Sequence, residues 1–364
     1  MTNLDARTLT LADFPDAVGE CLKEFFDSQR PLINTIDPVI TQAVSYLEDM
    51  VLGGGKRMRP MFAWAGYLGA GGTEIEDPAA VLRAVSALEF IQACALIHDD
   101  IIDESDTRRG SPTVHRRVEA LHKDNTWNGD AADFGIGVAI LIGDLALSWA
   151  EEMLQSSGLS PAALARVRGP WSAMKTEVIS GQILDITVES SGNESAEIAE
   201  KVNRFKTAAY TIERPLHIGA AIADADDNLV QAFRGFGQDI GIAFQLQDDI
   251  LGVFGDPAIT GKPAGDDLRE GKRTVLLAQA LRQADLTAPE KAKQLRQGIG
   301  KTADPQELAT LAAIIDEMGA QQVVEKRIAE LTASGLAHLD DAPLPDHIRA
   351  ALHELAIRAT KRAV

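Results

Sequence analysis

Cysteine is scarce in this sequence. The chain has only two, Cys21 and Cys94, and two thiols cannot build the disulfide framework that stabilises small secreted proteins. Cys94 falls inside an apolar segment, where cysteine usually acts as a small buried residue. Residues 1–30 also lack the basic and apolar segments of a secretory signal peptide. We therefore expect a cytoplasmic protein.

Positive charge is also in short supply. The chain has 35 lysines and arginines against 54 aspartates and glutamates, for a formal net charge of −19. This balance argues against nucleic acid or anionic lipid as a bulk partner. It does not exclude an anionic substrate, because metal ions and a few local basic residues can reverse the field inside a site. No stretch reaches the roughly eighteen uncharged apolar residues of a membrane-spanning helix, so we expect no integral membrane association.

Strand-like alternation and several well-known motifs are missing as well. We find no zinc-ligand spacing, no GxSxG and no Walker loop of the GxxxxGK[ST] type. Apolar residues instead recur at helical spacing through most of the chain, and 45% hydrophobic residues are ample for a core. We predict an all-α protein, with an N-terminal arm over residues 1–30 and a single helical domain over residues 31–364.

One apolar segment, residues 81–103, ends in a group of aspartates. Read as one helix, it places Asp99 and Asp103 on the same face, a single turn apart. Carboxylates crowded in this way repel each other unless a cation lies between them, and hard divalent cations prefer oxygen ligands. A solvated acidic helix end is the alternative for this pattern alone. Because Arg108 and Arg109 follow, we predict a metal site that adjoins an anion site.

A second apolar segment, residues 229–254, repeats the theme. It ends in Gln245, Asp248 and Asp249. Glycines at positions 235, 237 and 241 each weaken a helix by about 1 kcal/mol relative to alanine. They are understandable if another helix packs very close. Two acidic helix ends of this kind can face each other across a cavity and share metal ions.

A basic, glycine-rich segment precedes both. GGGKRMRP at 53–60 offers Lys56, Arg57 and Arg59 beside three glycines that let the backbone approach a ligand. A helix C-cap followed by a basic turn is the alternative.

These features resemble the trans-isoprenyl diphosphate synthases of the polyprenyl synthetase family, and most of all bacterial geranylgeranyl diphosphate synthases. The resemblance covers roughly residues 50–280. The motifs that carry it are, in chain order, GGGKRMRP at 53–60, DDIID at 99–103 with Arg108-Arg109-Gly110, Gly143-Asp144, Gly181-Gln182 with Asp185, Lys206-Thr207, FQLQDD at 244–249, and Gly261-Lys262 through Asp267 to Lys272. It implies an isoprenoid synthase fold, with ten or more helices around a deep central cavity, and a homodimer. It also implies head-to-tail condensation of isopentenyl diphosphate with an allylic diphosphate (dimethylallyl, geranyl or farnesyl), assisted by two or three Mg²⁺ ions.

The resemblance also assigns roles to residues. The metal ligands would be Asp99, Asp103 and Asp248, with Asp100 and Asp249 as supporting or weaker ligands. The allylic diphosphate would be held by Arg108, Lys206 and Lys262, with Gln245 and Thr207 near the leaving group and Lys272 in the following loop. Isopentenyl diphosphate would be bound by Lys56, Arg59, Gln92 and Arg109, with Arg57 supporting that subsite. The catalytic group would be Asp99, Asp103, Lys206, Gln245, Asp248 and Lys262.

One position departs from the family pattern. The fifth place of the second acidic motif, an aspartate in the family, is Gly252 here. Asp256 lies one further turn along and would replace it only if the helix continues that far.

Product length is expected to depend on the face of the first acidic helix. Counting back from Asp99, the positions on its side are Ala95, Ile91 and Leu88, with Cys94 at the margin. Phe90 falls on the opposite side and should pack into the core. Small residues at 94 and 95 leave the entrance open, with Ile91 and Leu88 as a floor, so we expect a geranylgeranyl product, with farnesyl as the alternative.

Two other functions stay open. A non-catalytic subunit of a heteromeric prenyl synthase would account for Gly252. A terpene cyclase or squalene-synthase-like enzyme shares metal-driven ionisation but has less need of the GGGKRMRP segment.

Overall fold

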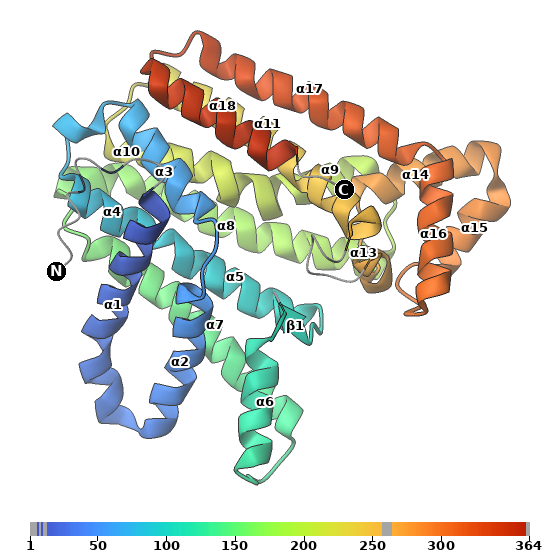
Figure 1. Cartoon of the computed structure of the whole chain (residues 1–364), viewed down its shortest axis with the longest axis horizontal. Coiled ribbons are helices and arrows are strands. Elements are labelled where there is room, and N and C mark those ends of the chain that lie inside the picture. Colours follow the sequence, from blue (N-terminus) through green and yellow to red (C-terminus); the bar gives the residue numbers. More distant parts are fainter. Residues whose placement is uncertain (1–5, 7–8, 10–12, 109, 257–263, 362–364) are drawn as a thin grey trace. The chain divides into compact units, whose positions relative to one another are not determined.

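The computed structural model describes residues 6, 9, 13–108, 110–256 and 264–361. The chain forms two compact units (Figure 1). Unit 1 comprises Met1–Arg168 and Ile218–Asp224, and unit 2 comprises Gly169–His217 and Ala225–Val364. Both units are helical, which confirms the all-α prediction. Among the described residues, the strands are confined to one two-residue pair.

Unit 1 holds the first half of the chain. Its elements are α1 (Phe14–Ile36), α2 (Pro38–Leu52), α3 (Met58–Gly69), η2 (Gly72–Glu74), α4 (Pro78–Ser86), α5 (Leu88–Ile102), β1 (Thr107–Arg108), β2 (Ser111–Pro112), α6 (Val114–Asp124) and α7 (Ala131–Gln155). The long helix α8 (Pro161–Ser191) begins in unit 1 and continues into unit 2.

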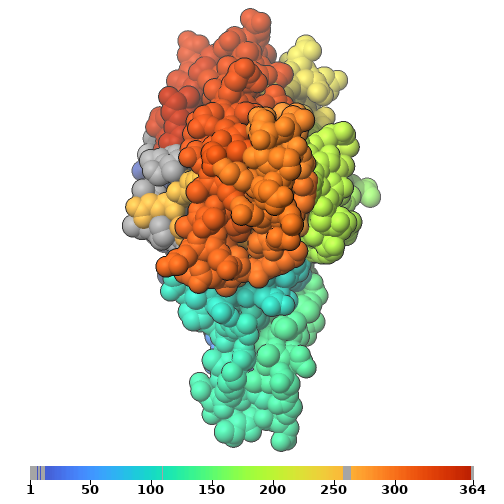
Figure 2. Space-filling model, turned by 90° about the vertical axis from the view of Figure 1, so that its right-hand side faces the viewer, coloured from blue at the N-terminus to red at the C-terminus, as the bar shows by residue number. Residues whose placement is uncertain are grey.

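Unit 2 is built around α11 (Asp227–Phe254). It also contains α9 (Ala196–Val202), the π-helix η3 (Asn203–Glu213), the start of α10 (Arg214–Ile222), α13 (Asp266–Glu270), α14 (Val275–Thr287), α15 (Pro289–Gly298), α16 (Pro305–Glu317), α17 (Ala320–Asp340) and α18 (Asp346–Thr360). Helices α17 and α18 lie along α11 (Figure 1). The apolar core joins α11 to α14–α17, and the outer surface of α15 and α16 appears in orange in Figure 2.

The N-terminal segment is more helical than its polar sequence suggests. Helix α1 runs from Phe14 to Ile36 and passes through residue 30, where the sequence predicted the end of an arm. Most of its apolar side chains recur at helical spacing and are buried, whereas Leu32 and Ile36 are exposed. Two of them, Phe25 and Phe26, pack against Phe90 with ring centroids 5.2 and 5.4 Å apart. The predicted core position of Phe90 is thereby confirmed.

The helix predicted over residues 81–103 is divided at Ala87, between α4 and α5. The hydroxyl of Ser86 donates a hydrogen bond to the carbonyl of Leu82 at 2.7 Å, a contact that often bends helices. The amide of Phe90 bonds to the carbonyl of Ala87 at 3.1 Å, three residues back instead of four. The face carrying Leu88, Ile91, Ala95 and Asp99 lies entirely within α5, so the break does not disturb it.

Among the described residues, two helical segments are long and apolar enough to cross a membrane by composition. For residues 78–102, 78% of the 18-residue apolar window is buried within the protein, as expected of a core helix. For residues 131–155, which form α7, only 28% of the apolar window is buried. Helix α7 therefore presents an uncovered apolar face.

Three glycines of α11 confirm the close packing predicted from their spacing. A Cβ on Gly237 would lie 2.4 Å from the Cα of Glu213, and one on Gly241 would lie 2.6 Å from the Cα of Ala208. Both contacts are with the π-helix η3. A Cβ on Gly235 would strike the ring of His338, on α17, at 2.6 Å. Glycine is required where backbones approach this closely.

Candidate active site

The first acidic helix end lies at the end of α5 in unit 1. Asp99 is in the last turn and Asp103 is the C-cap, and the amide of Asp103 bonds to the carbonyl of Asp99 at 2.8 Å. The two carboxylates therefore share one face, as predicted. Asp100 differs from both because its side chain is only 1% exposed.

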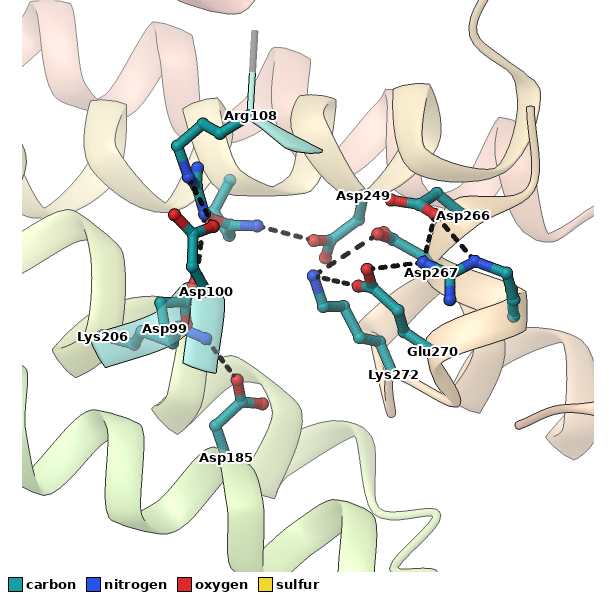
Figure 3. Close-up of polar contacts among 12 residues, drawn as sticks. Asp99, Asp100, Arg108, Asp185, Lys206, Asp249, Asp266, Asp267, Glu270 and Lys272 are labelled. Carbon is teal, nitrogen blue, oxygen red and sulfur yellow. Dashed lines mark hydrogen bonds and ion pairs between the residues drawn. The ribbon is translucent and has the colours of Figure 1, made fainter. Parts of the chain in front are cut away.

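Asp100 fixes an arginine beside this helix end. The Nε of Arg108 donates to Oδ1 of Asp100 at 2.7 Å, and its NH2 lies 3.6 Å from Oδ2 of Asp99 (Figure 3). Arg108 belongs to the small antiparallel hairpin of β1 and β2, whose turn contains Gly110 at a φ of +78°. Arg108, the predicted anion-binding residue, is thus held by the buried carboxylate of Asp100. It lies beside Asp99, a predicted metal ligand.

The basic segment joins α2 to α3 in the same unit. Gly53 caps α2, and the backbone then turns through Gly54 and Gly55 at φ of +92° and +139°. The helix C-cap followed by a turn is confirmed, and the binding of a ligand by this segment stays a prediction. Lys56 is exposed.

Arg57 has its side chain turned into the protein. It is buried, forms an ion pair with Glu89 of α5, and donates from NH2 to the carbonyl of Val51 at 2.7 Å. Its φ of +47° lies in the left-handed region, which is unusual for a residue other than glycine. Arg57 therefore ties the glycine-rich turn to α5, three residues before Gln92.

Gly143 allows α7 to approach α5 near Asp99. A Cβ on Gly143 would lie 2.3 Å from Nε2 of His98. That nitrogen is 3.2 Å from the carbonyl oxygen of Ile140 and 3.8 Å from the carboxylate of Asp144. The Gly143-Asp144 pair thus fixes the ring that directly precedes the first aspartate.

The second acidic helix end lies in α11, in unit 2. The Asp249 side chain is buried and accepts hydrogen bonds from Nε2 of Gln245 at 2.8 Å and from Nδ2 of Asn203 at 3.3 Å. Burial, followed by the negative charge of Asp267, raises the pKa of Asp249 to about 7. Asp248 is half-buried and lies next to it on the same turn. As in α5, the second aspartate of the pair is the buried one.

Lys206 and Thr207 lie on the π-helix η3. Nζ of Lys206 bonds to Oδ2 of Asp185 on α8 at 2.6 Å (Figure 3). Gly181, one turn earlier on α8, explains the approach, since a Cβ there would lie 2.3 Å from the backbone nitrogen of Lys206. The turns of a π-helix are wider than those of an α-helix, and π-helical turns occur often at functional sites. Lys206 is largely buried and paired, so it is not a plain surface lysine.

Helix α13 brings another carboxylate to the second acidic helix end. Helix α11 ends at Phe254 and Gly255 is extended, so Asp256 is exposed beyond the helix. Asp256 therefore does not replace the missing side chain of Gly252. The carboxylate of Asp267 lies over Gly252 instead. Lys272 is near it, with Nζ 2.9 Å from Glu270 and 3.7 Å from Asp267 (Figure 3).

Two predicted ligands, Arg109 and Lys262, lie outside the described residues. Three acidic or amide residues that the sequence did not single out contact the predicted site residues, namely Glu89, Asn203 and Glu270. Asp267 was named only as part of a loop motif, and its place over Gly252 was not predicted. Glu89 carried a signal, since a lone charge within an apolar helix needs a buried partner. The others depend on tertiary contacts.

Comparisons with known proteins identify the family of this chain. A protein-family model described as polyprenyl synthetase matches residues 38–318. The chain belongs to the polyprenyl synthetase family. It is therefore a prenyltransferase with the isoprenoid synthase fold. The family match favours this function over a terpene cyclase.

Three known proteins are similar to this chain. One is geranylgeranyl pyrophosphate synthase from Corynebacterium glutamicum, whose crystal structure is complexed with isoprenyl diphosphate and magnesium. Its sequence is 59% identical to this chain, and its structure has a TM-score of 0.95 and covers 98% of this chain and 100% of that one. Geranylfarnesyl diphosphate synthase from Aeropyrum pernix is 34% identical over 76% of this chain and 80% of its own length. Geranylgeranyl diphosphate synthase from Mycobacterium tuberculosis is 33% identical over 79% and 75%.

The residues fit a divalent metal in a particular way. Among the described residues, no three His, Cys, Asp or Glu side chains form a ready-made metal cage. Mg²⁺ is commonly held by only one or two carboxylates, with substrate phosphates and waters completing its shell. Asp99 and Asp103 on α5 in unit 1 have the carboxylate oxygens that such a metal prefers, and so does Asp248 on α11 in unit 2.

Proposed function

We propose that this protein condenses isopentenyl diphosphate head-to-tail with an allylic diphosphate and releases geranylgeranyl diphosphate. The observation that carries the proposal is the repeated design of the two acidic helix ends. In each, the second aspartate is buried and holds a neighbouring polar side chain, Arg108 in one and Gln245 in the other. The first aspartate, Asp99 or Asp248, is the less buried of each pair and is the one that we propose to bind the metal.

Two of the predicted cations for the allylic diphosphate, both among the described residues, have a carboxylate that orients them. Arg108 is held by Asp100, and Lys206 by Asp185. Such ion pairs fix the direction of the cations before substrate arrives, which is the preorganisation that stabilises developing negative charge. Bound Mg²⁺, which we expect as two or three ions, would neutralise charge on the departing diphosphate. Asp99, Asp103 and Asp248 are the ligands we propose for it, with Asp100 and Asp249 in support.

The proposed isopentenyl diphosphate subsite is built on α5 and the glycine-rich turn. Lys56, Arg59 and Gln92 are its proposed direct ligands. Arg57 would support this subsite without binding the substrate, because its guanidinium already contacts Glu89 and the carbonyl of Val51. Thr207 follows Lys206 on η3, which supports its proposed binding role. Lys272 lies near Asp267 beside the second acidic helix end, which supports the role proposed for it.

A twenty-carbon product is supported by the size of the side chains on the α5 face. Cys94 and Ala95 are half-buried and small, whereas Ile91 and Leu88, deeper on that face, are buried. A prenyl chain passing the first two would meet the second two. Geranylgeranyl diphosphate synthases among the relatives support the same length. Farnesyl diphosphate is the alternative, if the chain meets an obstacle earlier.

A homodimer in the cytoplasm is the assembly we propose. The exposed stripe of α7 contains three large apolar side chains, Ile136, Ile140 and Leu141. A second copy of this chain, bringing the same stripe, would cover it. Both cysteines are free, which supports a reducing compartment.

The decisive experiment mixes the full-length protein with isopentenyl diphosphate, Mg²⁺ and dimethylallyl, geranyl or farnesyl diphosphate in turn. The lipid is then identified by mass spectrometry after removal of the phosphates. A geranylgeranyl chain is expected from every primer, and none from the Asp99→Ala/Asp248→Ala variant. No condensation with any primer would favour a non-catalytic subunit, the reading that Gly252 suggests. Full turnover by the double variant would contradict the proposed metal ligands.

A further inference from the structure

The glycine in the second acidic motif is matched by a carboxylate from another part of unit 2. An ideal Cβ on Gly252 would lie 2.1 Å from Oδ2, 2.3 Å from Cγ and 2.8 Å from Oδ1 of Asp267. Real side chains do not tolerate such distances. The Asp267 carboxylate therefore occupies the volume that any side chain at position 252 would enter.

The backbone around Asp267 fixes this position. Asp267 lies in the first turn of α13, after Gly265 at a φ of +74°. Its own carbonyl accepts the amides of Gly271 and Lys272 at 3.1 and 3.0 Å. Its side chain is largely buried, with Nζ of Lys272 3.7 Å from Oδ1. The carboxylate is thus held over α11 by a tight helical turn.

Gly252 also lies on the face of α11 that carries Asp248, a proposed metal ligand. Positions 248 and 252 are four residues apart and therefore lie one above the other on a helix. The Asp267 carboxylate lies over Gly252, one helical turn from Asp248. It therefore adds a third carboxylate to this end of α11, beside Asp248 and Asp249.

We propose that Asp267 supplies the carboxylate that the second acidic motif lacks at position 252, so that Asp248 and Asp267 together serve the divalent metal on this side of the site. The inference rests on the proposed function. It also means that Gly252 is a steric requirement for Asp267. Restoring an aspartate at 252 alone would therefore weaken the site by displacing a carboxylate that is already there.

Mg²⁺ binding can be followed without catalysis. The full-length protein is titrated with Mg²⁺ in the presence of inorganic pyrophosphate, and the midpoint of the thermal shift is recorded. Asp267→Asn, which keeps the side-chain shape, should raise the Mg²⁺ midpoint about tenfold, as loss of a supporting carboxylate commonly does. Asp256→Asn is the matched control. It removes the same charge from an exposed residue beyond the helix end and should leave the midpoint unchanged.

A double-mutant cycle tests the geometry. Gly252→Ala should also raise the midpoint, because the added methyl group pushes the Asp267 carboxylate aside. In an Asp267→Ala background the same change should have no further effect, since the obstruction is gone. The exchange variant Gly252→Asp/Asp267→Ala should recover most of the lost affinity, whereas Gly252→Asp alone should not.

The outcomes separate this inference from the proposed function. A wild-type midpoint in folded Asp267→Asn, with condensation intact, would mean that Asp267 only packs the loop, and would overturn the inference alone. Additive effects of Gly252→Ala and Asp267→Ala would do the same. A wild-type protein that shows neither a Mg²⁺-dependent shift nor condensation would overturn the proposed function, and the inference with it.

Discussion

The guanidinium of Arg57 forms a buried ion pair with the carboxylate of Glu89 and so joins the glycine-rich turn to helix α5. Both side chains are almost inaccessible to solvent. A buried pair of this kind adds little net stability, but removal of one partner leaves an uncompensated charge in the interior. The pair therefore fixes where Lys56 and Gln92 lie relative to each other, since each is close in sequence to one partner.

Glu89→Ala should lower the free energy of unfolding by about 3–5 kcal/mol, because it strands the Arg57 charge. The measurement is urea denaturation at neutral pH. Arg57→Met/Glu89→Leu should be much less damaging, since neither charge is then left buried. Arg30→Ala is the control. Its ion pairs with Asp27 and Glu48 lie at the surface, where such pairs contribute about 1 kcal/mol or less. Equal losses in Glu89→Ala and Arg30→Ala would contradict the argument.

Gly181→Ala should separate α8 from the π-helix that carries Lys206. The new methyl carbon would meet backbone atoms of Lys206 at 2.3 and 2.7 Å, and backbone cannot move aside as a flexible side chain can. We expect a loss of about 1–3 kcal/mol in stability and a larger proportional loss in kcat/KM for the allylic substrate. Gly19→Ala is the matched control, because it lies in a helix with no atom within 4 Å of its Cβ position. It should be neutral or slightly stabilising. Undiminished turnover in Gly181→Ala would show that this contact does not position Lys206.

The sequence was sufficient for the fold class and for the acidic helix ends, because both depend on local spacing. The α5 face and the close approach at Gly237 and Gly241 follow directly from helical periodicity. The break at Ala87 did not follow, since it depends on a Ser86 side-chain bond that competes with helical geometry. The number of domains, predicted as one over residues 31–364, stays a prediction.

The site was less predictable where it depends on contacts between distant segments. Nothing local indicates that Asn203 donates to Asp249, or that Asp267 lies over Gly252. Position 252 was interpreted as a loss because its replacement lies fifteen residues along the chain, beyond the end of α11. The π-helix at Lys206 was also missed. It is selected by packing against the glycines of α11 and α8, and not by its own residue preferences.

Leu141→Glu should convert a dimer into a monomer. Leu141 is 66% exposed on the apolar stripe of α7, and a buried carboxylate without a partner is strongly unfavourable at an interface. The mass in solution is measured by analytical ultracentrifugation. Leu286→Glu is the control, because Leu286 is a similarly exposed leucine on α14 in unit 2 and its change should leave the mass unaltered. A wild-type monomer, or a Leu141→Glu dimer, would place the interface elsewhere or exclude it.

His217 should make the protein sensitive to mild acid. Burial, followed by the positive charges of Arg214 and Arg234, lowers the pKa of His217 to about 4 from 6.5. The unfolded chain therefore binds more protons than the folded one between these two pH values. The contribution of neutral His217 to stability is complete above the unfolded pKa and is lost as the pH falls through this window. Urea denaturation of the wild type and His217→Gln near pH 7.5 and pH 5 should show a smaller loss in the variant. Equal losses would mean that other groups account for the acid sensitivity.

Ala95→Phe should shorten the product. Ala95 is one turn before Asp99 on the face of α5 proposed to carry the growing chain, and Ile91 is one turn deeper. An aromatic ring at position 95 would stop the chain before it reaches Ile91 and Leu88, so farnesyl diphosphate should replace geranylgeranyl diphosphate as the main product. Phe90→Leu tests the opposite face. It should cost about 1–3 kcal/mol of stability through lost packing against Phe25 and Phe26, but leave product length unchanged. If Ala95→Phe makes the wild-type product at an undiminished rate, the chain runs along another helix and the floor is not formed by α5.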